Sequence, residues 1–125
     1  MKTIKRQVGD LGEDIAVRYL LARSYQIIER NFWRPWGEID IVAQNKGDMV
    51  FVEVKTLNQR ADRSYVPEQN VSWQKQRKLV RVCQLYLAQK KYPPNTAWQI
   101  DVIAVELNWQ THRANLRHLK NAVWN

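Results

Sequence analysis

The sequence is poor in cysteine and glycine, and each shortage excludes a class of function. The single cysteine, Cys83, cannot form an intramolecular disulfide or a Cys-x-x-Cys metal site. Apolar residues surround it at helical spacing, which favours a buried, unreactive thiol. The four glycines include no phosphate-binding loop, because Gly9-x-x-Gly12 lacks the Lys-Ser/Thr of such a loop and follows no predicted strand.

Histidines and long apolar runs are also scarce. The two histidines, His112 and His118, stand six residues apart with no acidic partner nearby, which argues against a zinc site and against a histidine-based nuclease. No apolar run approaches the ~18 residues of a membrane span, so we expect no membrane association. The basic first residues lead into no apolar segment, which argues against a secretory signal. We therefore expect a cytoplasmic protein.

Acidic residues are in the minority. The 125 residues include 20 lysines and arginines against 12 aspartates and glutamates, which gives a net charge of +8. Such an excess favours a polyanionic partner, and nucleic acid over membrane because no basic amphipathic anchor stands out. A basic surface that serves only solubility is the alternative. The length suits a single domain spanning residues 1–125.

Two runs rich in Ile, Val and Phe occupy the middle of the chain. Residues 36–43 and 49–55 each predict a strand. The connection between them, residues 45–48, contains a glycine and suits a hairpin turn. Whether the loop has two residues (46–47) or four (45–48), the residues paired across the hairpin have numbers that sum to 93. Asp40 should then stand directly opposite Glu53 on one face of the sheet.

The charges in these strands point to a metal ion. Strict alternation of side chains places Glu38, Asp40 and Val42 on one face. Two opposed carboxylates repel each other, and a divalent cation between them removes the conflict. Mg²⁺ keeps several of its waters, so two carboxylates plus a substrate phosphate suit it. Lys55 adds a positive charge two residues beyond Glu53.

An acid, a strand turn and a following Glu-x-Lys are the signature of the PD-(D/E)xK nuclease superfamily. Gly37-Glu38-Ile39-Asp40 and Val52-Glu53-Val54-Lys55, with the upstream Gly9-Asp10-x-x-Glu13, resemble the YraN-like family of bacterial proteins. That family is related to archaeal Holliday-junction resolvases. The resemblance covers residues 9–123, nearly the whole chain.

This resemblance implies a restriction-endonuclease-like core, an α/β (α+β) domain with a mixed central β-sheet flanked by helices. The order of the predicted elements agrees with such a layered domain. It implies that Asp40, Glu53 and Glu13 hold Mg²⁺ or Mn²⁺, with the backbone carbonyl of Val54 as a further ligand. Lys55 would orient the attacking water and stabilise the transition state. From the residues alone, Glu13 has another explanation, since acids are favoured near a helix N-terminus.

The remaining elements follow from spacing and turn signals. Residues 1–8 predict a flexible basic arm, and Asp10 predicts the cap of a helix through residue 23. A second helix is expected at 71–90, and further strands at 25–33, 96–107 and 115–123. The strand at 96–107 is almost continuously apolar, which predicts burial on both faces. Residues 57–70 are polar and lack periodicity, which predicts a mobile functional loop.

Basic residues near the two acids are candidate nucleic-acid contacts. Arg60 and Arg63 lie in the predicted loop. The helix at 71–90 has basic residues without acidic partners, so ion pairing along the helix does not explain them, although a solvated helix face would. Its candidate contacts are Gln74, Lys75, Arg77 and Lys78, and Lys75-Gln76 matches the family's pattern at this helix.

Two further features have more than one explanation. Trp33 and Trp36 precede the acids and could stack on unpaired bases or close the end of a core. Asp101 stands where the resembling family has an Arg-Phe-Asp-Val pattern, and this chain has Gln99-Ile100-Asp101-Val102. The exchange of Arg for Gln indicates an altered structural ion pair rather than a catalytic acid.

These features predict a Mg²⁺- or Mn²⁺-dependent endonuclease that acts on DNA, branched or junction DNA included. A homodimer is compatible with this function. The alternatives are a non-catalytic nucleic-acid-binding module and a structural partner of a DNA-processing complex. The complete set of Asp40, Glu53 and Lys55 favours the enzyme, because degenerate nucleases usually lose one member.

Overall fold

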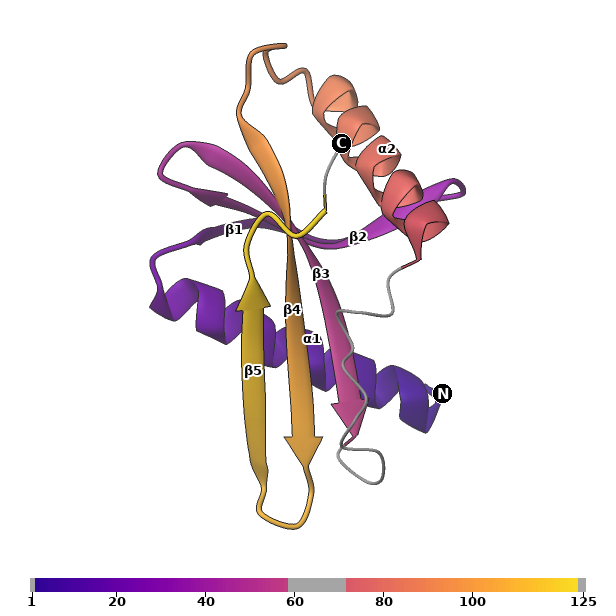
Figure 1. The fold of residues 1–125 in the computed structure, drawn as a ribbon, viewed down its shortest axis with the longest axis vertical. Coiled ribbons are helices and arrows are strands. Elements are labelled where there is room, and N and C mark those ends of the chain that lie inside the picture. Colours follow the sequence, from indigo (N-terminus) through magenta and orange to yellow (C-terminus); the bar gives the residue numbers. More distant parts are fainter. Residues whose placement is uncertain (1, 59–71, 124–125) are drawn as a thin grey trace.

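The computed structural model describes residues 2–58 and 72–123. α1 (Ile4–Ala22) precedes three strands, β1 (Gln26–Arg34), β2 (Gly37–Asn45) and β3 (Asp48–Asn58). α2 (Trp73–Gln89), β4 (Trp98–Asn108) and β5 (Arg113–Leu119) follow. Figure 1 shows the strands as one strongly twisted sheet, with α1 crossing behind it and α2 at the upper right near β2.

The sheet is mixed. Its strands lie in the order β1-β2-β3-β4-β5. Neighbouring strands are antiparallel except β3 and β4, which are parallel. A parallel pair requires a crossover connection, and the chain between β3 and β4 contains α2. The predicted fold class is confirmed, because a mixed sheet with two flanking helices is consistent with a restriction-endonuclease-like core.

Each helix covers one apolar face of the sheet. Leu20 of α1 packs in a cluster with Val52 and Ile103. Tyr86 of α2 packs in a second cluster with Phe51 and other residues of the opposite face. β4 contributes residues to both clusters, which confirms the prediction that this strand is buried on both faces.

The cysteine lies in the core beneath α2. Cys83 is fully buried in the apolar cluster that α2 forms with the sheet. Burial raises the pKa of the Cys83 thiol well above its ordinary value. The prediction of a buried thiol is therefore confirmed, and a thiolate nucleophile at this position is disfavoured.

The first helix begins earlier than predicted. Its cap is Thr3, whose hydroxyl accepts a hydrogen bond from the Arg6 amide at 3.1 Å. Residues 4–8 of the predicted flexible arm are thus helical, because a threonine with extended backbone is a good N-cap. Asp10 lies inside α1 and pairs with Lys2 at 2.6 Å instead of capping the helix. Glu13 is consequently too far from the N-terminus for a dipole effect to explain it.

Other boundaries differ by smaller amounts. β3 continues to Asn58, so residues 57 and 58 of the predicted loop belong to a strand, and residues 59–70 lie outside the described part of the chain. The last strand is Arg113–Leu119 rather than 115–123. The predicted helix at 71–90 is observed as α2, with Ser72 as its cap. Neither of the two helices in the described residues combines the length and apolarity needed to cross a membrane.

Candidate active site

The register of the β2–β3 hairpin agrees with the prediction. Its turn contains Lys46 and Gly47, both with positive φ, as a tight hairpin turn requires. Paired residues run from Asn45 opposite Asp48 to Ile41 opposite Val52, and their numbers sum to 93. The predicted pair of Asp40 and Glu53 would come next, and the ladder stops one pair before it.

Asp40 replaces the missing ladder contact with its side chain. Its Oδ2 accepts a hydrogen bond from the backbone N–H of Val54 at 2.8 Å. Because the N–H and C=O of one strand residue point to the same side, the Val54 carbonyl lies on the edge of β3 that faces Asp40. The two acids thus sit on neighbouring strands at the point where those strands separate.

The strict alternation predicted for β2 is wrong at Asp40. Ile39 and Val42 both pack in the cluster beneath α2, whereas Ile41 packs in the cluster beneath α1. A regular strand would place residues 39 and 41 on one face. The side chains of β2 therefore change faces at Asp40. The reason is that the β1–β2 hairpin leaves the plane of the sheet to pack on α2. A Cβ at Gly37 would lie 3.3 Å from Val82, which shows how closely the two meet.

Two lysines surround the Glu53 carboxylate. Lys55 Nζ lies 3.0 Å from Glu53 Oε1, and Lys75 Nζ of α2 lies 3.7 Å from the same oxygen. Burial opposes the charge on Lys55, but the Glu53 carboxylate outweighs it, so the Lys55 pKa is raised. The pKa of Lys75 is lowered, first by its contact with Lys55 and then by burial. The structure thus brings Glu53, Lys55 and the predicted helix lysine together.

Asp40 experiences the opposite electrostatic environment. Burial and the nearby charge of Glu53 raise the pKa of Asp40 to about 8, and Glu13 and Glu38 add to the effect. The Val54 N–H bond opposes this shift without cancelling it. A carboxyl group with this environment carries an uncompensated cost of ionisation, which a bound cation would relieve.

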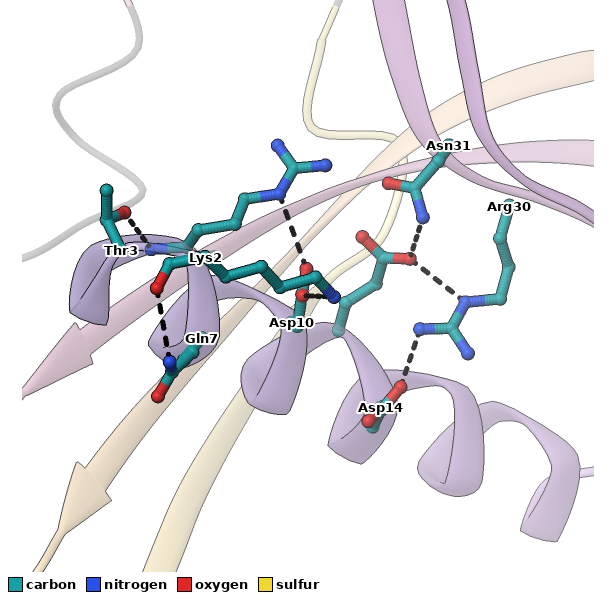
Figure 2. A network of polar contacts seen from close by, with 9 residues as sticks. Lys2, Thr3, Gln7, Asp10, Asp14, Arg30 and Asn31 are labelled. Carbon is teal, nitrogen blue, oxygen red and sulfur yellow. Dashed lines mark hydrogen bonds and ion pairs between the residues drawn. The ribbon is translucent and has the colours of Figure 1, made fainter.

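Glu13 is buried but tied to other partners. Its Oε1 accepts hydrogen bonds from Arg30 Nε at 2.9 Å and from Asn31 Nδ2 at 3.0 Å. Arg30 also bonds Asp14 at 2.7 Å, and Figure 2 shows this network along α1. The helix is held close to β3 here, since a Cβ at Gly12 would lie 1.9 Å from Thr56 Oγ1.

The three acids do not form a metal cluster. In residues 2–58 and 72–123, no group of three or more His, Cys, Asp or Glu side chains is placed to hold a metal ion. The arginine contact of Glu13 explains why the expected third ligand stands apart. Asp40 and Glu53 still offer hard carboxylate oxygens beside a strand carbonyl, and Mg²⁺ needs only one or two carboxylates because it retains water. These two residues fit a magnesium or manganese ion, and Glu13 fits an outer position.

An open pocket of about 680 Å³ lies beside Asp40. It is enclosed by the first half of α1 and by the ends of β2 and β3. Its lining includes the carboxylates of Asp40 and Glu13, and the basic side chains of Lys5 and Arg6. The pocket is large enough for part of a nucleotide chain, and its mixed charge suits a phosphate held near a cation.

The remaining predicted contacts lie on the first half of α2 or outside the described residues. Gln74, Lys75, Arg77 and Lys78 are exposed at the end of α2 that approaches Glu53. Arg77 stacks its guanidinium 4.7 Å from the centre of the Trp73 ring. Arg60 and Arg63 lie in the part of the chain that is not described, so their predicted role stays a prediction.

Sequence reasoning missed the partner of one histidine. His118 Nε2 lies 2.7 Å from Asp101 Oδ2, so the prediction that neither histidine has an acidic partner is wrong. Its Nδ1 lies 2.9 Å from the Tyr19 hydroxyl. Asp101 Oδ1 accepts bonds from Gln99 and from the Asn121 amide, both at 2.8 Å. The sequence signal that could have revealed this network was Asp101 itself, because a charged residue in an apolar strand requires buried partners.

A second omission concerns the partners of Glu13. Arg30 and Asn31 on β1 hold this carboxylate, and Asn31 has a φ of 52°. Neither residue stands in the motifs that define the site. An isolated basic residue in a strand was a weak signal, and only the packing of α1 across β1 made it significant.

The domain has a mixed sheet between two helices, and Asp40 and Glu53-Val54-Lys55 lie at the edge where β2 and β3 separate. This arrangement is that of a restriction-endonuclease-like core. Residues 12–105 match the family described as Uncharacterised protein family UPF0102, and the chain belongs to that family. The family prediction from the motifs is confirmed.

Relatives of similar length support the assignment. A UPF0102 protein of Roseiflexus castenholzii is 36% identical over 119 residues, covering 95% of this chain and 94% of the relative. One from Caldanaerobacter subterraneus subsp. tengcongensis is 41% identical over 111 residues, covering 86% and 85%. Among solved structures, Pyrococcus furiosus SfsA in complex with Ca²⁺ is 16% identical over 93% of this chain and 63% of that chain, with a TM-score of 0.42. A likeness this weak does not bear on function.

Proposed function

We propose that this protein is a Mg²⁺- or Mn²⁺-dependent endonuclease that acts on DNA, with branched and junction DNA among its substrates. The observation that carries the proposal is the pair of Asp40 and Glu53 at the edge where β2 and β3 separate, next to Lys55. Burial, followed by the charge of Glu53, raises the pKa of Asp40 to about 8, and a sheet that served only stability would avoid this arrangement.

Each side chain of the site would have a distinct role. Asp40 and Glu53 would hold the cation, with the Val54 carbonyl beside them, and the cation supplies Lewis-acid stabilisation of the phosphate and activation of water. The Val54 N–H fixes the orientation of the Asp40 carboxylate. Lys55, kept protonated by Glu53, presents a fixed positive charge to the phosphate that is attacked. Lys75 adds a second cation from α2.

The charge of the protein supports a nucleic-acid substrate. The excess of basic residues gives +8, and several of them lie on α2, whose Lys75 reaches Glu53. Phosphate contacts of this kind position a nucleic acid without reading its sequence. We therefore expect shape, rather than sequence, to select the substrate.

One observation favours a second candidate function. The Glu53 carboxylate is already balanced by Lys55 and Lys75, and Glu13 by Arg30. A non-catalytic nucleic-acid-binding module, alone or as a structural partner in a DNA-processing complex, would use the same basic face with the acids neutralised internally. Only a cleavage assay separates this function from the endonuclease.

The test is incubation of the purified protein with four-way junction, flap and linear DNA, with Mn²⁺, Mg²⁺ or EDTA. We expect cleavage that requires the metal and is lost in Asp40→Asn. Asp48→Asn is the matched control, because Asp48 is an exposed acid at the turn of the same hairpin. Cleavage that persists in Asp40→Asn would assign the activity to a contaminant, and no cleavage of any substrate would favour the binding module.

A further inference from the structure

Three exposed tryptophans flank the candidate active site. Trp33 and Trp36 lie at the β1–β2 turn, and Trp73 is the first residue of α2. Their exposed fractions are 62%, 48% and 68% respectively. A single exposed indole needs no explanation, whereas several on elements that lead to one candidate site indicate an interaction surface. Their exposure argues against the alternative that Trp33 and Trp36 close the end of a core, and the neighbouring Phe32 is the aromatic residue that is buried there.

The elements that carry these rings also lead to the two acids. The β1–β2 turn leads into β2, where Asp40 follows Trp36 by four residues. Trp33 pairs across the hairpin with Glu38, which lines the pocket beside Asp40. Trp73 precedes Lys75 by two residues, and the Lys75 ammonium lies 3.7 Å from Glu53. The rings therefore lie on the two elements that carry Asp40 or reach Glu53.

Positive charge accompanies the rings. The Arg77 guanidinium lies 4.7 Å from the centre of the Trp73 ring, and Arg34 lies next to Trp33 with its guanidinium 4.2 Å from the centre of the Phe32 ring. Lys78 and Arg81 are exposed on the same helix as Trp73. Flat rings interleaved with cations are complementary to a single strand of nucleic acid, whose bases stack while its phosphates bind the cations. A paired duplex hides its base faces and would not use the rings.

We infer that Trp33, Trp36 and Trp73 form an aromatic rim that stacks on unpaired bases beside the phosphate held at Asp40 and Glu53. The substrate class is nucleic acid with a single-stranded segment at the site, such as a flap, a fork or an overhang. This inference takes from the proposed function only that nucleic acid is the ligand, and it does not require cleavage.

The test separates base stacking from phosphate binding. Binding of a fluorescein-labelled oligothymidylate of twelve nucleotides would be compared with binding of an abasic oligomer of equal length, in EDTA so that no cleavage occurs. We expect wild type to prefer the oligomer with bases. Trp36→Leu and Trp73→Leu should each weaken that binding by roughly five- to a hundredfold, the range of base–aromatic stacking, and leave abasic binding unchanged. Trp36→Phe should retain most of the affinity because it keeps a flat ring.

Two controls keep the result interpretable. Trp109→Ala removes an equally exposed tryptophan at the β4–β5 connection, where its Nε1 bonds Asn58 at 2.8 Å, and should leave both affinities unchanged. The tryptophan variants remove no charge, so the salt dependence of binding should stay as in wild type, whereas Lys78→Ala should reduce its slope. Circular dichroism of each variant would verify that it is folded.

Several outcomes would overturn the inference. Equal affinity of wild type for the two oligomers would do so, and so would Leu variants that bind like wild type. A dimer that the Leu variants dissociate, without any preference for bases, would show that the rim is a protein interface instead. Failure of the proposed function is distinct, because a protein that cuts nothing but binds bases through these rings would keep the rim and lose only the nuclease.

Discussion

Two aspartates on the same sheet, Asp101 fully buried and Asp40 half-buried, have opposite electrostatic environments. Asp101 on β4 is fully buried, and its carboxylate accepts hydrogen bonds from His118, Gln99 and the Asn121 amide. Burial alone would raise the pKa of Asp101, but these donors outweigh it and hold the pKa below its ordinary value. Asp40 has one backbone donor and several like charges, and burial raises its pKa to about 8.

The difference separates a structural acid from a functional one. A buried carboxylate whose partners are all supplied by the fold contributes to stability and has nothing left for a ligand. A carboxylate that is withdrawn from solvent next to other acids destabilises the metal-free protein. A functional requirement, such as binding a cation, would explain why the sequence retains it. Asp101 is the more deeply buried of the two and still has the lowered pKa, so the balance of charge rather than burial distinguishes them.

The largest effect on stability should come from Asp101. Asp101→Ala leaves the donors of His118, Gln99 and Asn121 without an acceptor inside the core. We expect the free energy of unfolding to fall by roughly 3–5 kcal/mol, as for other broken buried pairs. Urea unfolding followed by circular dichroism would measure it. A change below about 1 kcal/mol would contradict the structural role of Asp101.

The largest effect on activity should come from Lys55. Lys55→Ala removes the fixed positive charge beside Glu53 and should lower the cleavage rate by about 10²-fold or more. DNA affinity should fall far less, because many other basic residues share the phosphates, and the free energy of unfolding should change much less than in Asp101→Ala. Single-turnover cleavage of a branched substrate with Mn²⁺ is the measurement. Equal rates in mutant and wild type would remove Lys55 from the mechanism.

Asp40 should show the opposite pH dependence to Asp101. The folded protein holds the Asp40 proton up to a pH of about 8, whereas the unfolded chain releases it near its ordinary value of 3.8. The folded state binds more protons between these values, so its stability should decrease as the pH rises from about 4 to 8. Asp101, with a lowered pKa, contributes stability above its ordinary value that is lost as the pH falls.

The Asp40 effect is measured with Asp40→Asn in EDTA. The variant should lack this decrease and, at pH 8, exceed wild type in unfolding free energy by at least about 1.4 kcal/mol, which corresponds to one pKa unit. Added Mn²⁺ should stabilise wild type and not the variant, because a ligand of the native state raises its stability. Parallel pH profiles of the two proteins would contradict the electrostatic account of Asp40.

The smallest effect concerns the salt dependence of nucleic-acid binding. Lys75→Ala should reduce the slope of log affinity against log salt by about one unit, since one phosphate contact is lost. The same change in Arg60→Ala would extend the contact surface to the segment that follows β3. Fluorescence anisotropy at several salt concentrations checks both. An unchanged slope in Lys75→Ala would confine this lysine to its contact with Glu53.

The sequence anticipated features that depend on local patterns. The turn at Lys46 and Gly47 fixes the hairpin register, and apolar periodicity identifies α2 and the doubly buried β4. Asp40 and Glu53 could therefore be assigned from spacing alone to the neighbouring strands of one hairpin. Local capping signals were less decisive, because both Thr3 and Asp10 are good N-caps and the sequence offers no reason to prefer the first.

Features that depend on how distant elements meet could not be predicted. Asp101 and His118 lie on β4 and β5, and their pairing depends on the register of an edge strand whose bounds were uncertain. The reversal of β2 at Asp40 arises from packing of the β1–β2 turn on α2. Glu13 was assigned to the metal cluster by resemblance, and its bond to Arg30 follows only from the position of α1 across β1. Each case joins residues at least 15 positions apart in the chain.

The bond between Asp40 and the Val54 amide also protects an edge of the sheet. Past the pair of Ile41 and Val52, β3 continues to Asn58 with no β2 residue paired beside it in the described part of the chain. Unpaired strand edges are templates on which a second chain can add a strand, and this is a route to aggregation. The Asp40 side chain, whose oxygen already accepts the Val54 N–H, leaves that amide unavailable to an added strand. Alanine at position 40 would therefore open a strand edge to self-association as well as remove a ligand, whereas asparagine keeps the acceptor in place.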